Sequence, residues 1–190
     1  MDGDPELLAA VLAGGAGERL GGSKATAELA GRPLVSYPLA ALAEAGIDAV
    51  VVAKADTELP PALPVPVVVE PGEPRHPLLG VATALGHAPG RPVLALACDM
   101  PFANAALLGR LAAAGAPAVV AAGGRVHPAL ALYPASSEAM LREAVAGGRS
   151  ATAALEALAP AIVEATEEET FNVNTPEDLA YAASIVTRAL

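Results

Sequence analysis

Short apolar segments alternate with longer stretches of helical composition, and this alternation restricts the fold more than any other feature of the chain. The apolar segments are bounded by Gly or Pro and cover residues 7–13, 49–53, 65–69, 93–97, 118–121 and 129–133. Nearly continuous apolar segments of this length are typical of β-strands in a sheet that is covered on both faces.

The stretches between the apolar segments predict helices, and four of these stretches end at a glycine, which is a common signal for a helix C-terminus. We expect helices over residues 33–45, 78–85, 103–114, 136–146, 150–158 and 176–190. Strands that alternate with helices predict βαβ units, so the fold class is α/β with a mainly parallel sheet. The pair Gly123-Gly124 between two apolar segments predicts a hairpin, so one edge of the sheet should be antiparallel.

Composition and charge narrow the classes of function. The chain has 190 residues and a net charge of −10, so we expect one domain over residues 1–190 and no general nucleic-acid binding, which needs a basic face. No apolar run approaches about 18 residues, so no membrane span is expected. The acidic start MDGDPELL is unlike a signal peptide, and the single cysteine, Cys98, suits a cytoplasmic protein without an intramolecular disulfide.

The segment LAGGAGERLGGSK at residues 12–24 follows the first predicted strand and combines five glycines with two cations, Arg19 and Lys24. Glycines let successive backbone amides approach and surround an anion, and the two cations indicate a polyphosphate. The dinucleotide fingerprint does not fit because its last glycine position is Leu20. The ATPase loop does not fit because Ser23 and Lys24 stand in reversed order. A surface turn with chance cations is the alternative interpretation.

Two carboxylates follow predicted strands. Asp99 comes at the end of the segment VLALACD, and ligands of open α/β sheets bind at the carboxyl ends of strands. A carboxylate beside a polyphosphate is a candidate Mg²⁺ ligand, although Asp99 could instead cap the helix that follows. Glu70 ends the segment VPVVVE and could contact the nucleotide or support the metal, or simply face solvent before a turn.

Three basic residues are candidates for an anionic second substrate. Arg125 and His127 follow the predicted hairpin, and Arg149 precedes the helix that begins near Ser150, where helix N-termini favour phosphate. For His127 the alternative is a lone histidine at the start of a strand.

The segment FNVNTPEDL at residues 171–179 has two parts. Thr175-Pro176 predicts a helix start, with Thr as the N-cap and Pro at the first helical position. Asn172 and Asn174 alternate along an extended segment, so both should face one side, where they bind a polar ligand or satisfy local backbone groups.

Taken together, these segments resemble the molybdenum cofactor guanylyltransferases. The resemblance runs in family order through LAGG at 12–15, Arg19 with GGSK at 21–24, GRPL at 31–34, PLLG at 77–80, DMP at 99–101, residues 125–132 and residues 172–179. It therefore covers nearly the whole chain. It implies a single Rossmann-like three-layer α/β/α nucleotidyltransferase domain.

The resemblance also implies a reaction, in which GTP and (molybdo)molybdopterin give the guanine dinucleotide form of the cofactor and pyrophosphate. Mg²⁺ is the implied cofactor. The implied partners are GTP, molybdopterin with or without molybdenum, and other cofactor-biosynthesis proteins.

Residue roles follow from the resemblance in the same way. The implied nucleotide-binding residues are Leu12, Ala13, Gly14, Gly15, Lys24, Glu70 and Asp99. The implied catalytic residues are Arg19, Lys24 and Asp99, of which Asp99 holds Mg²⁺. The implied pterin-binding residues are Arg125, His127, Arg149, Asn172 and Asn174.

Three positions depart from the family pattern. Ser23 replaces the Asp that usually precedes the loop lysine, Ala53 replaces an Asn that contacts nucleotide, and Glu70 replaces an Asp. The sequence LAGG is typical of the guanylyl branch, whereas cytidylyl members more often have LAAG. The alternatives are a cytidylyltransferase acting on molybdopterin or another small phosphate, a sugar-1-phosphate nucleotidyltransferase, for which the chain is short, and a non-catalytic nucleotide-binding domain.

Overall fold

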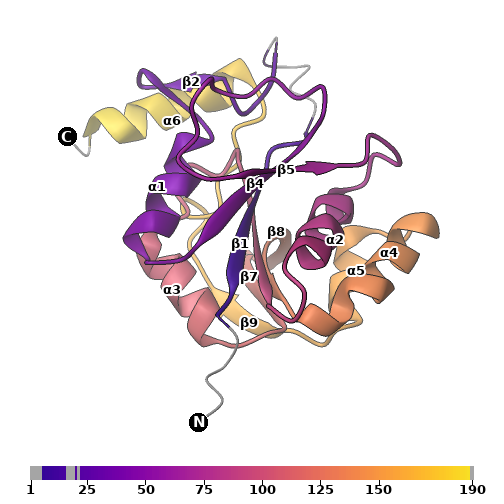
Figure 1. Ribbon diagram of the computed structural model, residues 1–190. Helices are drawn as coiled ribbons and strands as arrows, with labels where there is room; N and C mark the ends of the chain where they lie inside the picture. Colours follow the sequence, from indigo (N-terminus) through magenta and orange to yellow (C-terminus); the bar gives the residue numbers. More distant parts are fainter. Residues whose placement is uncertain (1–5, 16–19, 21, 189–190) are drawn as a thin grey trace.

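A seven-stranded sheet runs through the molecule, and helices cover both of its faces (Figure 1). The computed structural model describes residues 6–15, 20 and 22–188. The strands lie in the order β5-β4-β1-β6-β8-β7-β9. Their bounds are β1 Leu8–Leu12, β4 Ala49–Lys54, β5 Val67–Glu70, β6 Val93–Ala97, β7 Ala118–Ala122, β8 Arg125–Tyr133 and β9 Ala161–Glu164. A separate small hairpin pairs β2 (Glu28–Leu29) with β3 (Arg32–Pro33).

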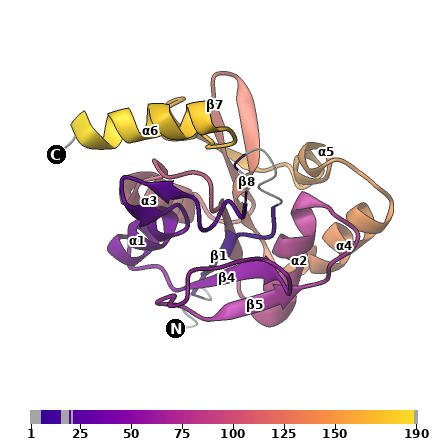
Figure 2. The same cartoon turned by 90° about the horizontal axis from the view of Figure 1, so that it is seen from above.

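The helices form the outer layers of a three-layer α/β/α arrangement (Figure 2). Their bounds are α1 Ser36–Glu44, α2 Pro77–His87, α3 Ala105–Ala113, α4 Glu138–Ala146, α5 Ala151–Glu156 and α6 Pro176–Arg188, and the 3-10 turn η2 (Ala135–Ser137) leads into α4. Helices α1 and α3 cover one face of the sheet, and α2, α4 and α5 cover the other. The α/β class and the three-layer arrangement are confirmed.

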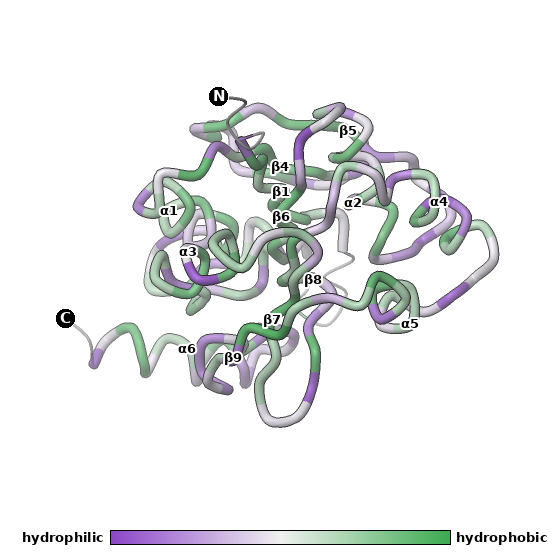
Figure 3. Tube along the Cα trace, turned by 90° about the horizontal axis from the view of Figure 1, so that it is seen from below, coloured by the Kyte–Doolittle hydropathy of each residue, from purple (hydrophilic) through white to green (hydrophobic). Residues whose placement is uncertain are grey.

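Strand periodicity divides the core between these layers. In β1, Ala9 and Val11 pack with the α1 and α3 side, whereas Leu8 and Ala10 pack with the α2, α4 and α5 side. Successive side chains of a strand point to opposite faces, so a sheet covered on both sides needs apolar residues at nearly every position. Figure 3 shows the result as a continuous hydrophobic centre formed by the strands.

The sheet is mainly parallel, as predicted, and β8 runs antiparallel to both of its neighbours, β6 and β7. Gly123 and Gly124 have φ values of 55° and 75°, which suit the tight turn of the predicted hairpin. The antiparallel strand does not lie at the edge of the sheet, however, because β9 pairs in parallel with β7 beyond it. The sequence did not predict β9, since three of its four residues are exposed and it lacks a buried apolar pattern.

The start of α6 agrees with the capping residue predicted from the sequence, and the start of α3 does not. Thr175 Oγ1 accepts a hydrogen bond from the Asp178 amide at 3.1 Å, so Thr175 caps α6 as predicted. Helix α3 begins later than expected, and Asn104 is its N-cap, since Asn104 Oδ1 accepts from the Leu107 amide at 2.9 Å. The interpretation of Asp99 as the cap of this helix is therefore wrong.

The order of the strands creates the place for a site. From β1 the chain passes through α1 to β4 on one side, and it later returns through α2 to β6 on the other side of β1. The carboxyl ends of β1 and β6 therefore lie at a topological switch point, where open α/β sheets bind ligands. No helix in the described parts of the chain is long and apolar enough to cross a bilayer.

Candidate functional site

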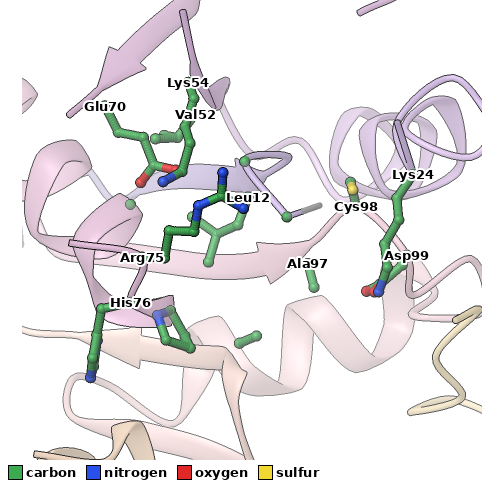
Figure 4. A pocket seen from close by; sticks show the side chains of 15 residues that line it. Leu12, Lys24, Val52, Lys54, Glu70, Arg75, His76, Ala97, Cys98 and Asp99 are labelled. Atoms are coloured by element: carbon green, nitrogen blue, oxygen red, sulfur yellow. The ribbon is translucent and has the colours of Figure 1, made fainter. Parts of the chain in front are cut away.

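A pocket of about 290 Å³ opens at this switch point. Its walls come from the carboxyl ends of β1, β4, β5 and β6, the glycine-rich loop and the start of α2. Leu12, Gly14 and Gly15 line it, whereas Ala13 is turned into the core layer below α1 and α3. The two lysines of the chain, Lys24 and Lys54, both line it, at opposite ends (Figure 4).

One end of the pocket holds Lys24 between two oxygen atoms. Lys24 Nζ lies 2.6 Å from Asp99 Oδ2 and 2.6 Å from Asn174 Oδ1, so three distant segments of the chain meet at one ammonium group. The lysine and aspartate side chains are 17% and 13% exposed. The Val173 amide donates to the Asp99 carbonyl at 2.9 Å, which fixes the 172–174 segment against the end of β6. We call these three residues the phosphate end, after the polyphosphate that the sequence predicts beside Lys24.

The opposite end holds a buried carboxylate. Glu70 is 8% exposed and lies directly below Gly14, where any Cβ atom would overlap with Glu70 Oε1. Burial raises the pKa of Glu70, and the Lys54 ammonium group opposes that rise. Lys54 and Glu70 are register partners on the neighbouring strands β4 and β5. Together with Gly14 they form what we call the base end, after the nucleobase that we propose it binds.

Three charged or polar residues of the pocket were missed by the sequence analysis, Lys54, Arg75 and His76. His76 is the N-cap of α2, where its Nδ1 accepts from the Leu78 amide at 3.1 Å. An amide can only donate, so Nδ1 carries no proton, and the protonated Nε2 donates to the Arg149 carbonyl at 2.7 Å. Histidine is not a typical capping residue, so only its place before Pro77 could have pointed to it. The rule that selected Asp99 and Glu70, a polar residue at the carboxyl end of a strand, also applies to Lys54.

The other predicted residues lie in different places. Arg125 and Arg149 are exposed, and neither lines the pocket described above; Arg149 reaches it through its backbone bond to His76. His127 is half-buried, and burial, followed by the charge of Arg125, lowers its pKa. His127 is therefore neutral at pH 7 and offers hydrogen bonds rather than a positive charge.

The two asparagines differ in their surroundings. Asn174 contacts Lys24, and its amide nitrogen lies 3.4 Å from the Asn172 carbonyl oxygen, whereas Asn172 is half-buried beside it. The link between Asn174 and the glycine-loop lysine was not predicted from the sequence. Arg19 lies outside the described residues.

Two residues near the strand ends have simpler roles. Cys98 is buried, and burial raises the pKa of its thiol, so it remains protonated and is not a nucleophile. Ala53, where the family pattern has Asn, is 1% exposed and packs in the core layer of α1 and α3, while its neighbours Val52 and Lys54 line the pocket.

The donors present suit a metal ion that arrives with its ligand. Within the described residues no group of three or more His, Cys, Asp or Glu side chains is placed to hold a metal. Asp99 is the carboxylate at the phosphate end. Mg²⁺ is commonly bound by one or two carboxylates together with substrate phosphates and water, and this donor set fits that mode.

The comparisons with known proteins agree with this geometry. The family model of the MobA-like NTP transferase domain matches residues 9–162. The chain belongs to the MobA-like NTP transferase family. The molybdenum cofactor guanylyltransferase of Cereibacter sphaeroides is 36% identical over 190 residues, which cover 96% of this chain and 98% of that protein.

Two solved structures show the same fold. The molybdopterin-guanine dinucleotide biosynthesis protein A from Archaeoglobus fulgidus superposes with a TM-score of 0.77 at 25% identity, covering 96% of this chain and all of that one. The 2-C-methyl-D-erythritol 4-phosphate cytidylyltransferase from Thermus thermophilus superposes with a TM-score of 0.69 at 24% identity, covering 96% and 99% of the two chains. A MobA-like fold therefore does not by itself select the base.

Proposed function

We propose that this protein transfers GMP from GTP to the terminal phosphate of molybdopterin, with or without molybdenum, and releases pyrophosphate. The observation that carries the proposal is the two-ended pocket, with a lysine and an aspartate at one end and a buried carboxylate at the other. The names of the relatives that match nearly the whole chain support the choice of donor and acceptor.

To catalyse this transfer, the protein has to position the two substrates and stabilise the negative charge of the phosphates. The phosphate of the acceptor is already a nucleophile and needs no general base, so it attacks the α-phosphorus of GTP in line as pyrophosphate leaves. Lys24 exchanges its contact with Asp99 for the oxygens of the triphosphate, and the loop amide at Gly15 donates to the same group. We assign Arg19 as a second cation on the strength of the sequence pattern alone.

Asp99 is the residue we assign to Mg²⁺. Bound Mg²⁺ supplies neutralisation of charge on the phosphate oxygens. Asp99 would hold the ion once Lys24 has moved to the phosphates, while Asn174 Oδ1 would keep its contact with the lysine. The two changes belong together, because a lysine and a divalent cation cannot share one oxygen without strong repulsion.

Glu70 is the residue that favours guanine. Guanine offers two adjacent donors, N1–H and the 2-amino group, and a carboxylate with two oxygens accepts both. Cytosine and adenine offer an amino group beside an unprotonated ring nitrogen, whose lone pair a carboxylate repels. A buried acceptor pair of this kind therefore disfavours CTP and ATP.

The second substrate lies on the side of the phosphate end away from the base in this proposal. Asn172 and Arg125 would face the pterin, Arg149 would contribute its positive charge, and His127 would contribute a hydrogen bond in its neutral form. Asn174 joins this region to Lys24, so it acts on both substrates.

Pyrophosphate release tests the proposal. Purified protein, Mg²⁺ and molybdopterin should release pyrophosphate with GTP, but not with CTP or ATP, and GTP without molybdopterin should give none. Release with CTP instead would move the protein to the cytidylyl alternative. GTP binding without release from any acceptor would favour a non-catalytic nucleotide-binding domain.

A further inference from the structure

Lys54 is a pocket residue that neither the motifs nor the phosphate chemistry accounts for. It ends β4, directly opposite Glu70 in the register of β4 and β5. Its stem packs near the loop backbone, because its Cγ lies 3.5 Å from the position that a Cβ of Gly14 would take. The lysine is therefore held at the base end, away from the triphosphate.

The ammonium group of Lys54 has hydrogen-bonding capacity to spare. Its Nζ donates to the Gly72 carbonyl at 2.5 Å, and an ammonium group carries three donors. Figure 4 shows Lys54 and Glu70 side by side at one end of the pocket. A donor and a two-oxygen acceptor thus stand next to each other on adjacent strands.

This pair complements one base edge. Guanine presents the O6 acceptor next to the N1–H and 2-amino donors, so an ammonium beside a carboxylate matches all three groups. Adenine and cytosine place an amino donor where guanine has O6, and that donor would meet the ammonium group. The order of charges across the two strands is thus specific for guanine.

We infer that Lys54 donates a hydrogen bond to guanine O6, beside the carboxylate of Glu70, and is a specificity-determining residue of this site. The inference rests on the proposed function, since it assumes that the pocket takes GTP. It adds a second and independent contact to the one assigned to Glu70.

A purely structural role for Lys54 makes a different prediction. If the lysine only holds the 71–75 segment through Gly72, or only neutralises Glu70, its removal lowers the affinity for every purine nucleotide by the same factor. A lysine that contacts O6 discriminates between nucleotides that differ only at position 6. A comparison of nucleotide analogues therefore separates the two roles.

The experiment is calorimetric binding with Mg²⁺ and no second substrate. The probes are GTP, ITP, which lacks the 2-amino group, 6-thio-GTP, whose sulfur is a weak acceptor in place of O6, and CTP. The proteins are the wild type, Lys54→Met and Lys54→Arg, the second of which keeps the charge and the donors. Glu70→Gln is the matched change on the partner strand. If the Lys54→Met protein does not fold, Lys54→Leu takes its place.

We expect the wild type to prefer GTP over 6-thio-GTP and over ITP by roughly 10-fold each, since a hydrogen bond to a charged group has about that value. Lys54→Met should lose the preference over 6-thio-GTP and keep the preference over ITP. Lys54→Arg should retain both preferences, and Glu70→Gln should weaken mainly the preference over ITP.

If Lys54→Met lowers the affinity for GTP, ITP and 6-thio-GTP by the same factor, or lowers none of them, the inference is overturned while the proposed function is left intact. A wild-type protein that binds GTP no better than CTP would instead overturn the proposed function, and the inference with it.

Discussion

The two ends of the pocket differ in how they are built. At the phosphate end, Lys24, Asp99 and Asn174 come from segments 75 and 150 positions apart and meet through two hydrogen bonds at a partly exposed ammonium group. At the base end, Glu70 and Lys54 stand opposite each other on neighbouring strands, and Glu70 is buried below Gly14.

The two ends therefore differ in their state before a ligand binds: one holds an ion pair that can be exchanged, and the other holds a desolvated carboxylate. The ion pair at the phosphate end can exchange its partners when a triphosphate and a metal ion arrive, because each partner is also a ligand for them. The base end keeps a carboxylate desolvated before any base is present, and this raises the cost of its charge. Under the proposed function, the first end serves the reaction and the second serves the selection of guanine.

The largest effect is expected from Asp99→Asn at the phosphate end. Turnover should fall about 100-fold or more, because the neutral amide is a poor ligand for Mg²⁺, while GTP binding should change far less. Steady-state pyrophosphate release measures the first quantity and calorimetry the second. Asp48→Asn, at an exposed carboxylate beside Arg91, is the control. Turnover near that of the wild type would remove Asp99 from the metal site.

At the base end, Gly14→Ala should lower GTP affinity roughly 10-fold, the value of a lost charged hydrogen bond. The new methyl group would overlap with Glu70 Oε1, so the carboxylate must leave its position. Gly15→Ala is the matched comparison, because no described atom lies within 4 Å of its added Cβ, and its loss should be smaller. Equal losses in the two variants would show that the position of Glu70 does not decide binding.

Asn174→Ala tests whether the phosphate end acts as one unit. GTP affinity measured without molybdopterin should fall about 5-fold, because Oδ1 no longer holds Lys24 Nζ. Combined with Lys24→Met, the loss should not increase, since both changes remove the same contact. Asn172→Ala should leave GTP affinity unchanged, because its backbone carbonyl is retained. If Asn174→Ala alters only the KM for the acceptor, Asn174 has no part in holding Lys24.

The smallest effect concerns the stability cost of the base end. Because burial raises the pKa of Glu70, the folded protein holds this proton more tightly than the unfolded chain does. The folded state therefore loses stability as the pH rises from the ordinary value of 4.5 through the raised pKa. Glu70→Gln should have a higher Tm than the wild type at pH 7.5, by roughly 2–4 °C for each kcal/mol of relief in a chain of this length.

The same comparison at lower pH supplies the control for this prediction. The Tm difference should shrink as the pH falls below 4.5, where Glu70 is protonated in both states. A Glu70→Gln variant that is less stable than the wild type at pH 7.5 would contradict the prediction that the charged Glu70 carboxylate destabilises the fold.

The sequence predicted most of the fold from its local patterns of apolar and capping residues. The strand and helix pattern predicted the α/β sheet because each buried strand is a continuous apolar run, and it missed β9 because an exposed edge strand has no such run. The sequence left Asp99 open as an alternative cap of α3, and the observed bond from the Leu107 amide assigns the cap to Asn104.

For the site, sequence rules located residues but not their contacts. The glycine loop, Asp99 and Glu70 all line the pocket because ligands and polar residues gather at the carboxyl ends of strands. The contact of Asn174 with Lys24 depends on how the 172–174 segment returns to β6, which no local pattern encodes. The burial of Glu70 and the place of Lys54 beside it likewise depend on strand register.

In the proposed function, one pocket holds the base at Glu70 and the triphosphate at Lys24. A crystal structure of the protein with GTP and Mg²⁺ tests it most directly. We expect the guanine edge against Glu70 and Lys54, and the phosphates against Lys24 and the glycine loop, with Asp99 free of the lysine. Guanine beside Asn174, or GTP bound outside this pocket, would contradict it.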